Sequence, residues 1–157
     1  TMNLKKLNWL FISAFVLVLD QWTKLIALKY LDMYIARPIM PFLNFTLAYN
    51  TGAAFSFLDA ASGWQRWLFI GIALSVAVLA LIWLLRSHNN EHLLPVALAL
   101  IMGGAVSNVL DRIRLGSVVD FIDVYVKTWH WPAFNVADSA ICIGVFILLL
   151  LMFFEPD

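Results

Sequence analysis

Two aspartates stand where a strongly apolar chain would be expected to avoid charge. Asp138 lies about one helical turn inside the apolar run 134–154, and Asp120 lies in the preceding stretch VVDFID. Ionisable groups within membrane-spanning segments are rare, and they usually mark a functional site. If Asp120 and Asp138 meet at one edge of the membrane, they cannot easily both ionise, so one keeps its proton and the other becomes a base.

A carboxylate pair of this kind can hydrolyse an amide bond. The ionised carboxylate deprotonates a water molecule while the protonated one polarises the carbonyl oxygen, as in aspartic proteases. Nothing in the sequence tells which aspartate begins as the base. Asp138 also has a structural interpretation, because with Asn135 as the N-cap it would stand at position N3 of a helix and bond the cap. By default, Asp120 and Asp123 would be solvated acids of a strand or loop.

Further polar residues beside the apolar runs could likewise have either a structural or a functional role. Asp20 and Lys24 are four residues apart with the acid first, which suits an ion pair on one helix face that makes a buried polar stretch tolerable. The amide of Asn108 needs partners if it lies in lipid. Asp111 and Arg112 could form an interfacial charge pair, or Arg112 could hold a carboxylate or a lipid phosphate.

Other chemistries fit the sequence less well. The single cysteine, Cys142, excludes an internal disulfide and a cysteine zinc cluster, and no histidine is near it in sequence to activate the thiol. His88, His92 and His130 are dispersed, so no histidine metal site is expected. A formal net charge of zero gives no nucleic-acid footprint. We therefore expect no metal, no cofactor and no nucleic-acid partner.

The composition places these residues in a membrane protein. The chain has 157 residues, of which 63% are hydrophobic and 13% charged, and its mean hydropathy is +0.88. Soluble domains carry about 25% charged residues. We therefore predict one integral membrane domain, 1–157, with an all-α core. Two lysines precede the first apolar stretch, as in a secretory signal, but no small-residue cleavage site follows, so a retained first span is expected.

Hydropathy predicts four membrane spans, approximately 9–28, 67–85, 93–110 and 134–154. Gly103 and Gly104 in the third indicate close helix packing. Because successive spans alternate in direction, the segments 29–66 and 111–133 lie on one face of the membrane. That face gathers the polar residues Asp20, Lys24, Asn50, Asn108, Asp111, Arg112, Asp120, Asp123, Asn135 and Asp138. Charge counting does not settle which face this is, because the total of lysines and arginines favours the cytoplasm whereas Lys5 and Lys6 favour the opposite.

Parts of the polar segments have the pattern of short strands. PFLNFTLAYNTGAAFSF alternates apolar with small or polar residues, which predicts a short strand pair or a folded-over extended segment, with a turn at 50–52. SVVDFIDVYV predicts another strand, and KTWHWPAF a tryptophan-rich interfacial stretch. The expected architecture is therefore four membrane helices with a small β-structure at the polar face.

Four motifs resemble those of lipoprotein signal peptidase, the signal peptidase II family: DQWTK (20–24), YNTGAAFS (49–56), GGAVSNVLDRIRLGSVVDFIDVY (103–125) and PAFNVADSAI (132–141). They extend over essentially the whole chain, and their combined order and spacing are specific. The resemblance implies a multi-pass aspartic protease of the bacterial cytoplasmic (inner) membrane. It has four transmembrane helices, a small extracytoplasmic β-rich cradle and a lid of loop or short helix. Its substrates are diacylglyceryl-modified prolipoproteins, cut just before the lipidated cysteine.

The resemblance assigns residues as well. The catalytic aspartates would be Asp120 and Asp138, supported by Asp20, Lys24, Asn50, Gly52, Asn108, Asp111, Arg112 and Asn135. The three asparagines could hold an extended substrate backbone, which cannot stay unpaired in lipid. Arg112 could help position the diacylglyceryl group, and the segment 32–63 could cover the site. Both termini would be cytoplasmic and the polar face extracytoplasmic, and we expect a monomer that contacts membrane lipids.

Two other functions stay open on the residues alone. A small proton-coupled transporter could use intramembrane carboxylates as a relay. However, it needs access from both faces, and the second and fourth spans are almost purely apolar away from the polar face. A non-catalytic assembly factor could instead use the polar face to bind partners. Precursor cleavage that requires both aspartates would distinguish an enzyme from either.

Overall fold

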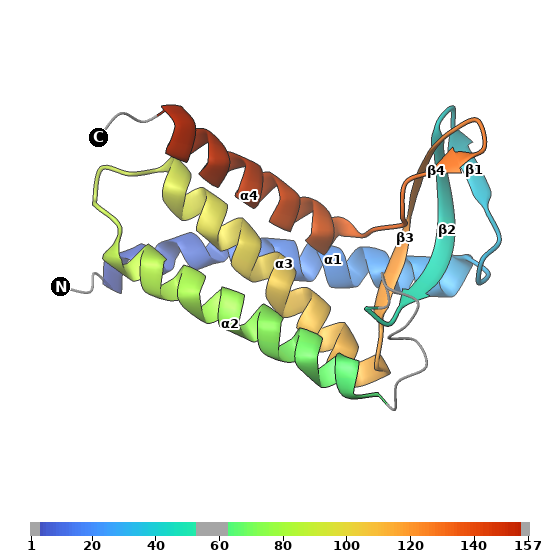
Figure 1. Cartoon of the computed structure of the whole chain (residues 1–157), viewed down its shortest axis with the longest axis horizontal. Coiled ribbons are helices and arrows are strands. Elements are labelled where there is room, and N and C mark those ends of the chain that lie inside the picture. Colours follow the sequence, from blue (N-terminus) through green and yellow to red (C-terminus); the bar gives the residue numbers. More distant parts are fainter. Residues whose placement is uncertain (1–3, 53–62, 155–157) are drawn as a thin grey trace.

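Four long helices form the body of the protein (Figure 1). The computed structural model describes residues 4–52 and 63–154. The helices are α1 (Leu10–Tyr30), which follows the 3-10 turn η1 (Leu4–Trp9), α2 (Trp64–Arg86), α3 (Leu93–Leu115) and α4 (Val136–Phe154). Because all four are long and apolar enough to cross a membrane, the predicted four-helix membrane class is confirmed.

The helices that carry polar residues extend beyond the predicted spans. α1 continues to Tyr30 rather than 28. α3 continues to Leu115 rather than 110, where Gly116 ends it in the left-handed conformation with φ 77°. Hydropathy measures only how much apolar surface is available, whereas helical hydrogen bonding continues through polar residues whose side chains find partners. Asn108 and Asp111 therefore project from regular helix, at fixed angles to each other.

α3 is the centre of the bundle, because it packs against each of the other helices. In its most apolar window 67% of the residues are buried, against 17% in α4 and 28% in α2. Two glycines allow this packing: a Cβ at Gly103 would lie 2.7 Å from the carbonyl oxygen of Ser13, and one at Gly104 would lie 2.4 Å from that of Ala137. The predicted packing role of both glycines is confirmed.

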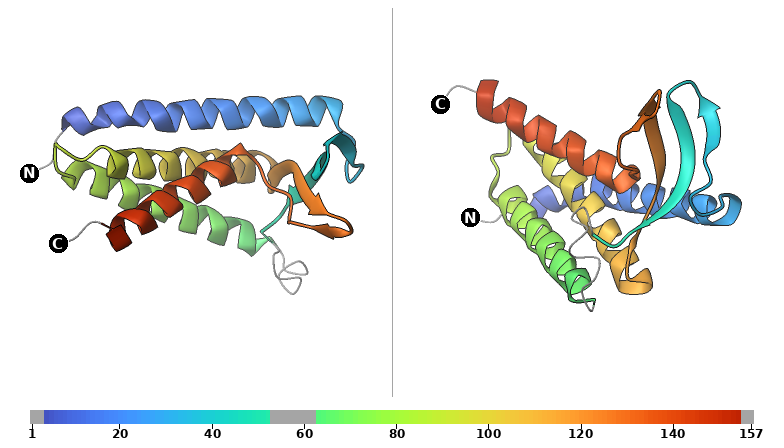
Figure 2. Two further views of the ribbon diagram at one scale, coloured as in Figure 1. Left: turned by 90° about the horizontal axis from the view of Figure 1, so that it is seen from above. Right: turned by 45° about the vertical axis from the view of Figure 1, so that its right-hand side comes forward.

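A small antiparallel sheet lies at one end of the bundle, away from the start of α1 and the end of α4 (Figures 1 and 2). Its strands are β1 (Arg37–Met40), β2 (Leu43–Asn50), β3 (Val118–Val126) and β4 (Trp129–His130), adjacent in that order. The strand predicted in 117–126 is confirmed as β3, and the stretch 41–57 does carry one strand, β2. The hairpin partner of β2 is β1, which precedes it; a partner after the turn at 50–52 would fall on residues 53–57, which lie outside the described residues. The segment 32–63 was predicted to cover the site. Its first part carries β1 and β2, and residues 53–62 lie outside the described residues.

The junction between α3 and β3 fixes where the sheet stands relative to the helices. Only Gly116 and Ser117 separate the two elements, so Asp120 is held close to the polar end of α3. Within the sheet, Ala48 of β2 lies opposite Asp120, and the register shifts between Phe45 and Ala48. The backbone of β3 also bonds to Phe134, just before α4. Strand β3 therefore connects the end of α3 with the start of α4.

Candidate active site

A buried ammonium group is the structural basis of the site. Lys24 Nζ lies 2.6 Å from Asp20 Oδ2 and 2.8 Å from Asp111 Oδ2, and it donates to Asn108 Oδ1 at 3.1 Å. The Lys24 side chain is 2% exposed, so its charge requires these partners. The predicted Asp20–Lys24 ion pair is confirmed. Asp111, for which a pairing with Arg112 was also considered, makes its ion pair with Lys24.

The acids of this cluster hold neighbouring elements as well. Asp20 accepts hydrogen bonds from Ser107 Oγ at 2.6 Å and from the backbone N–H of Ala137 at 2.8 Å. Asp111 accepts a bond from the backbone N–H of Val119 at 3.0 Å. One buried charge cluster thereby links α1 to α3, to strand β3 beside Asp120, and to the first turn of α4 beside Asp138.

Asn135 joins the two aspartates of interest. Its fully buried side chain donates through Nδ2 to Asp120 Oδ1 at 2.8 Å, and its backbone N–H donates to Asp138 Oδ2 at 3.1 Å. Asn108 Nδ2 donates to the other oxygen, Asp138 Oδ1, at 2.9 Å. Asp120 and Asp138 therefore meet around one asparagine, although they come from a strand and a helix.

Asp138 also has the capping role considered from the sequence. Its backbone N–H donates to Asn135 Oδ1 at 2.8 Å, while the Asn135 N–H donates back to its carboxylate. This reciprocal pair is the capping-box arrangement, with Asn135 as the cap. The capping interpretation is confirmed, and it leaves one carboxylate oxygen for Asn108.

The environment of Asp120 keeps a proton on it near neutral pH. Burial raises its pKa to about 7, and the negative charge of Asp138 acts in the same direction. Hydrogen bonds from Asn50 and Asn135 and the charge of Lys24 oppose this effect but do not outweigh it. One carboxyl group that is half protonated at neutral pH beside another is the arrangement that acid–base hydrolysis of a peptide requires.

Asn50 and Gly52 form the turn predicted at the end of β2. The backbone N–H of Gly52 donates to Asn50 Oδ1 at 2.8 Å, and Gly52 has φ 87°. A Cβ at Gly52 would lie 2.3 Å from the ring of Phe69 in α2, so only glycine lets the turn pack there. The Arg112 guanidinium lies over the same ring, 5.4 Å from its centroid. Its charge acts on Asp138 and Asp120.

Sequence reasoning missed two members of this network, Ser107 and Gln21. The Oγ of Ser107 both donates to Asp20 and accepts a bond from Gln21 Nε2 at 2.9 Å. The position of Ser107 four residues before Asp111, on the same side of α3, was the available signal. Asp123 instead binds His130, Nδ1 to Oδ1, at 2.7 Å within the sheet.

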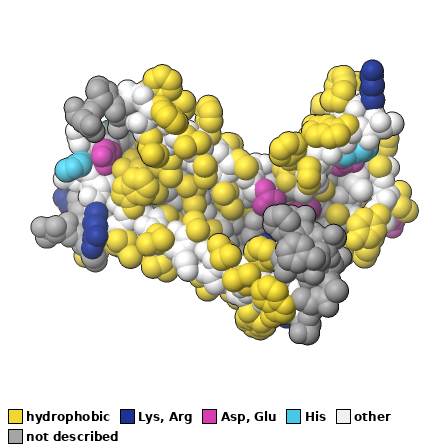
Figure 3. All heavy atoms as spheres, viewed as in Figure 1, with side chains coloured by type: hydrophobic (Ala, Val, Ile, Leu, Met, Phe, Trp, Pro, Cys, Tyr) yellow, Lys and Arg dark blue, Asp and Glu magenta, His cyan; other side chains and the backbone are white. Residues whose placement is uncertain are grey.

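Acidic side chains are exposed in a notch between the helical bundle and the sheet (Figure 3). The described residues contain no group of three or more histidine, cysteine, aspartate or glutamate side chains that could hold a metal ion. The two carboxyl groups that share Asn135 have the arrangement used in acid–base hydrolysis.

Comparison with known proteins decides between the possible functions. A family model described as Signal peptidase (SPase) II matches residues 12–154. The chain belongs to the signal peptidase II family. It is accordingly a membrane-embedded aspartic endopeptidase, and neither the transporter nor the non-catalytic alternative finds support.

Individual relatives agree with the family. The chain is 50% identical over 151 residues to the lipoprotein signal peptidase of Alteromonas mediterranea, which covers 96% of this chain and 83% of that protein. It is 54% identical to that of Acinetobacter baumannii, with 94% and 84% covered. A solved structure titled as a bacterial membrane enzyme, determined in meso at 1.9 Å, superposes with a TM-score of 0.85. Its sequence identity is 30%, and 95% of this chain and 94% of that one are covered.

Proposed function

We propose that this signal peptidase removes the signal peptide from diacylglyceryl-modified prolipoproteins with Asp120 and Asp138 as its catalytic pair. The observation that carries the proposal is the position of Asn135, which bonds both carboxylates at once. The cut falls just before the lipidated cysteine, as the relatives' name, lipoprotein signal peptidase, and the resemblance described above suggest. The apolar helix faces are suited to the signal peptide and the acyl chains of such a substrate.

The two aspartates have different starting states in this mechanism. Asp138 accepts hydrogen bonds from Asn108 Nδ2 and the Asn135 N–H at a helix N-terminus, which stabilises a negative charge. It begins as the base. Asp120, whose pKa is about 7 because of burial, begins as the acid. Asp138 takes a proton from water, the hydroxide attacks the scissile carbonyl carbon, and Asp120 protonates the carbonyl oxygen to give a diol.

Collapse of the diol reverses the two roles. Asp120 takes a proton back from a diol hydroxyl as the carbonyl re-forms, and Asp138 gives its proton to the leaving amine of the lipidated cysteine. The peptide bond breaks and both carboxyl groups return to their first state, so that no covalent intermediate is needed. The enzyme is ready for a second substrate.

The remaining site residues position the substrate and the pair. Asn50 interacts with the Asp120 carboxyl group and lies at a strand end, where its amide can bond an extended substrate backbone. Arg112, stacked on Phe69, offers its charge to a polar group near the scissile bond. The buried charge cluster holds the elements that carry the two aspartates; its members are Asp20, Lys24, Asn108 and Asp111. Gly52 keeps the Asn50 turn packed against α2.

The proposed topology places the sheet and the aspartates on the extracytoplasmic face and both termini in the cytoplasm of a bacterium. An even number of spans requires both ends on one side, and the start of α1 and the end of α4 lie together in Figure 1, away from the sheet. We propose a monomer surrounded by membrane lipid. Labelling of single cysteines placed at His88 and at Thr128 by a membrane-impermeant reagent distinguishes the two orientations.

Cleavage of a lipidated precursor by purified variants tests the catalytic assignment. Asp120→Asn and Asp138→Asn should each abolish cleavage, because an amide cannot carry the proton, while the proteins remain folded. The amide keeps the size of the side chain but accepts hydrogen bonds through one oxygen only, so Asp138→Asn should lose about 1–3 kcal/mol of stability with one of its two bonds. Asp123→Asn, in the same strand as Asp120 but bonded to His130, is the matched control and should keep most of the activity. Near-normal turnover by either of the first two variants would remove the assignment.

A further inference from the structure

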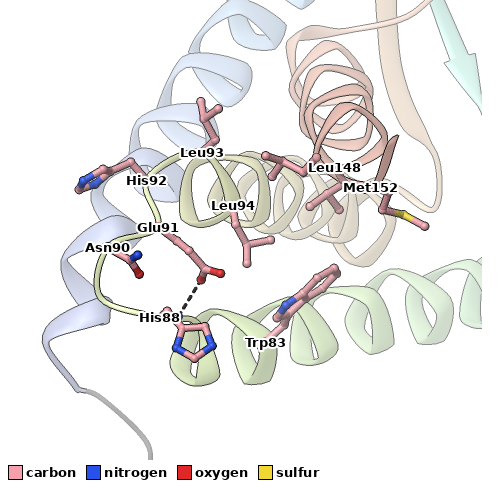
Figure 4. A pocket seen from close by; sticks show the side chains of 10 residues that line it. Trp83, His88, Asn90, Glu91, His92, Leu93, Leu94, Leu148 and Met152 are labelled. Carbon is pink, nitrogen blue, oxygen red and sulfur yellow. Dashed lines mark hydrogen bonds between the residues drawn. The ribbon is translucent and has the colours of Figure 1, made fainter. Parts of the chain in front are cut away.

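A second hollow lies at the end of the bundle opposite the aspartates (Figure 4). Its volume is about 940 Å³, which is at the upper end of the roughly 300–1,000 Å³ typical of ligand sites. It is enclosed by Trp83 near the end of α2, by the loop 88–92, by Leu94 of α3 and by Leu148 and Met152 of α4. The catalytic proposal above does not use it.

The hollow is lined by an acidic, an aromatic and an apolar part. Glu91 carries its acidic group, and Oε2 accepts a hydrogen bond from the backbone N–H of His88 at 2.7 Å, which fixes the carboxylate (Figure 4). The indole of Trp83, 48% exposed, lies across from it. Leu94 and Leu148 form an apolar floor. A carboxylate beside an aromatic ring over an apolar floor suits a lysine or arginine side chain, with its aliphatic stem below.

The positive charges of Lys6 and Arg86 do not occupy this place. The ammonium of Lys6 is already engaged, because it donates to the carbonyl oxygen of His88 at 2.5 Å. Arg86 is exposed at the end of α2 and is not among the lining residues. An anionic lipid phosphate would meet the fixed carboxylate of Glu91 at this point, which is unfavourable. A peptide cation fits the hollow better than a phospholipid headgroup does.

The distance between the hollow and the aspartates matches the substrate of a signal peptidase. From Asp138 to Leu151, which also lines the hollow, α4 rises about 20 Å at ~1.5 Å per residue. A signal peptide has a positively charged first region followed by an apolar region of about 7–15 residues. As a helix that apolar region spans roughly 10–22 Å. With the scissile bond at the aspartates, the charged region reaches the end of the bundle where Glu91 lies.

We infer that this hollow binds the basic first region of the substrate's signal peptide, with a lysine or arginine between Glu91 and Trp83. The inference rests on the proposed function, because it concerns the same substrate. It adds a second recognition site, one helix length from the cleavage site. Substrates are thus selected by the charge before their apolar region as well as by the lipidated cysteine after it.

Two matched precursors test the site. Both carry the lipidated cysteine and the same apolar region, and they differ only in two lysines or two glutamines in the first region. Steady-state cleavage by the purified enzyme should show that Glu91→Gln raises KM about three- to fivefold for the lysine precursor with kcat unchanged. The glutamine precursor should be cleaved equally by both enzymes. Because glutamine keeps an acceptor for the His88 N–H, the loop is preserved.

A charge reversal completes the test. Glu91→Lys should prefer a precursor with two glutamates in its first region, and the wild type should prefer lysine. If Glu91→Gln changed KM for both precursors alike, or for neither, the inference would be wrong. It would equally be wrong if the preference appeared only on adding phospholipid vesicles and did not depend on Glu91, since the occupant would then be a lipid. Failure of the wild type to cleave any of the precursors would contradict the proposed function instead.

Discussion

Replacing Lys24 by methionine removes the ammonium group that forms ion pairs with Asp20 and Asp111. Methionine has nearly the volume of the lysine stem, so the perturbation is the loss of charge and hydrogen bonds rather than a cavity. The ammonium makes an ion pair at 2.6 Å, another at 2.8 Å and a hydrogen bond at 3.1 Å to Asn108. At 2% exposure, water cannot replace these contacts.

The expected loss of stability follows from the two carboxylates, Asp20 and Asp111, that would remain buried without a positive partner. Removing one partner of a buried ion pair costs about 3–5 kcal/mol, because the remaining charge stays desolvated. That is a large part of the ~5–15 kcal/mol of a typical domain. The triple change Lys24→Met, Asp20→Asn, Asp111→Asn should recover at least about half of the loss, because it leaves no unpaired charge in the interior.

Denaturant unfolding in mixed micelles, followed by tryptophan fluorescence, gives the free energy of unfolding for each variant. Lys29→Met is the matched control, because Lys29 is exposed in the last turn of the same helix; it should change stability by less than about 0.5 kcal/mol. A Lys24→Met protein within about 1 kcal/mol of the wild type would refute this reasoning. So would a triple variant no more stable than the single one.

Three further outcomes are expected. The rate of cleavage should fall as pH rises through about 7, because burial and the charge of Asp138 raise the pKa of Asp120 to about 7 and only its protonated form donates to the carbonyl. Asn50→Ala removes a hydrogen bond that opposes this shift, so it should move the alkaline limb of the pH–rate profile to higher pH; an unmoved limb would contradict the assignment. Burial favours protonation of Asp123, but hydrogen bonds from His130, Asn44 and Thr46 outweigh it and hold its pKa below the ordinary value. That stabilisation is present above the ordinary carboxyl pKa and is lost as pH falls through the lowered one. His130→Ala should therefore cost less than about 1 kcal/mol at neutral pH and nothing in strong acid, as measured by unfolding. Gly104→Ala should cost about 1–3 kcal/mol because its Cβ would meet the Ala137 carbonyl oxygen. Gly71→Ala has open space around it and should be neutral or slightly stabilising in the same unfolding assay; similar losses in both would contradict the packing argument.

The helices and strands were predictable because each follows from local pattern. Long apolar runs predict spans, and alternation predicts β2 and β3. The helix ends were less predictable, since hydropathy falls at Asn108 whereas the helix continues to Leu115. The continuation depends on hydrogen bonds between helices, such as that from Lys24 in α1 to Asn108 in α3. The sequence of either segment alone does not indicate such a bond.

The contacts of the site likewise divide into those that local spacing predicts and those that depend on the tertiary fold. Asp20 with Lys24 and Asn135 with Asp138 are three or four residues apart, so helix geometry alone brings each pair together. The bond from Asn135 to Asp120 depends on how β3 returns from α3, which spacing does not encode. Asp111 and Arg112 are adjacent in sequence, yet neighbours on a helix point about 100° apart. Asp111 therefore turns inward to Lys24, whereas Arg112 turns to Phe69.

The capping role of Asp138 and its proposed catalytic role support each other. The capping box fixes the side chain, with Asn135 N–H on one carboxylate oxygen and Asn108 on the other. A carboxylate already held in one rotamer loses little freedom when a substrate binds. The helix N-terminus also favours negative charge at this position, whereas burial on a strand disfavours it at Asp120. The proposed base thus stands at the N-terminus of a helix, and the proposed acid stands on a buried strand.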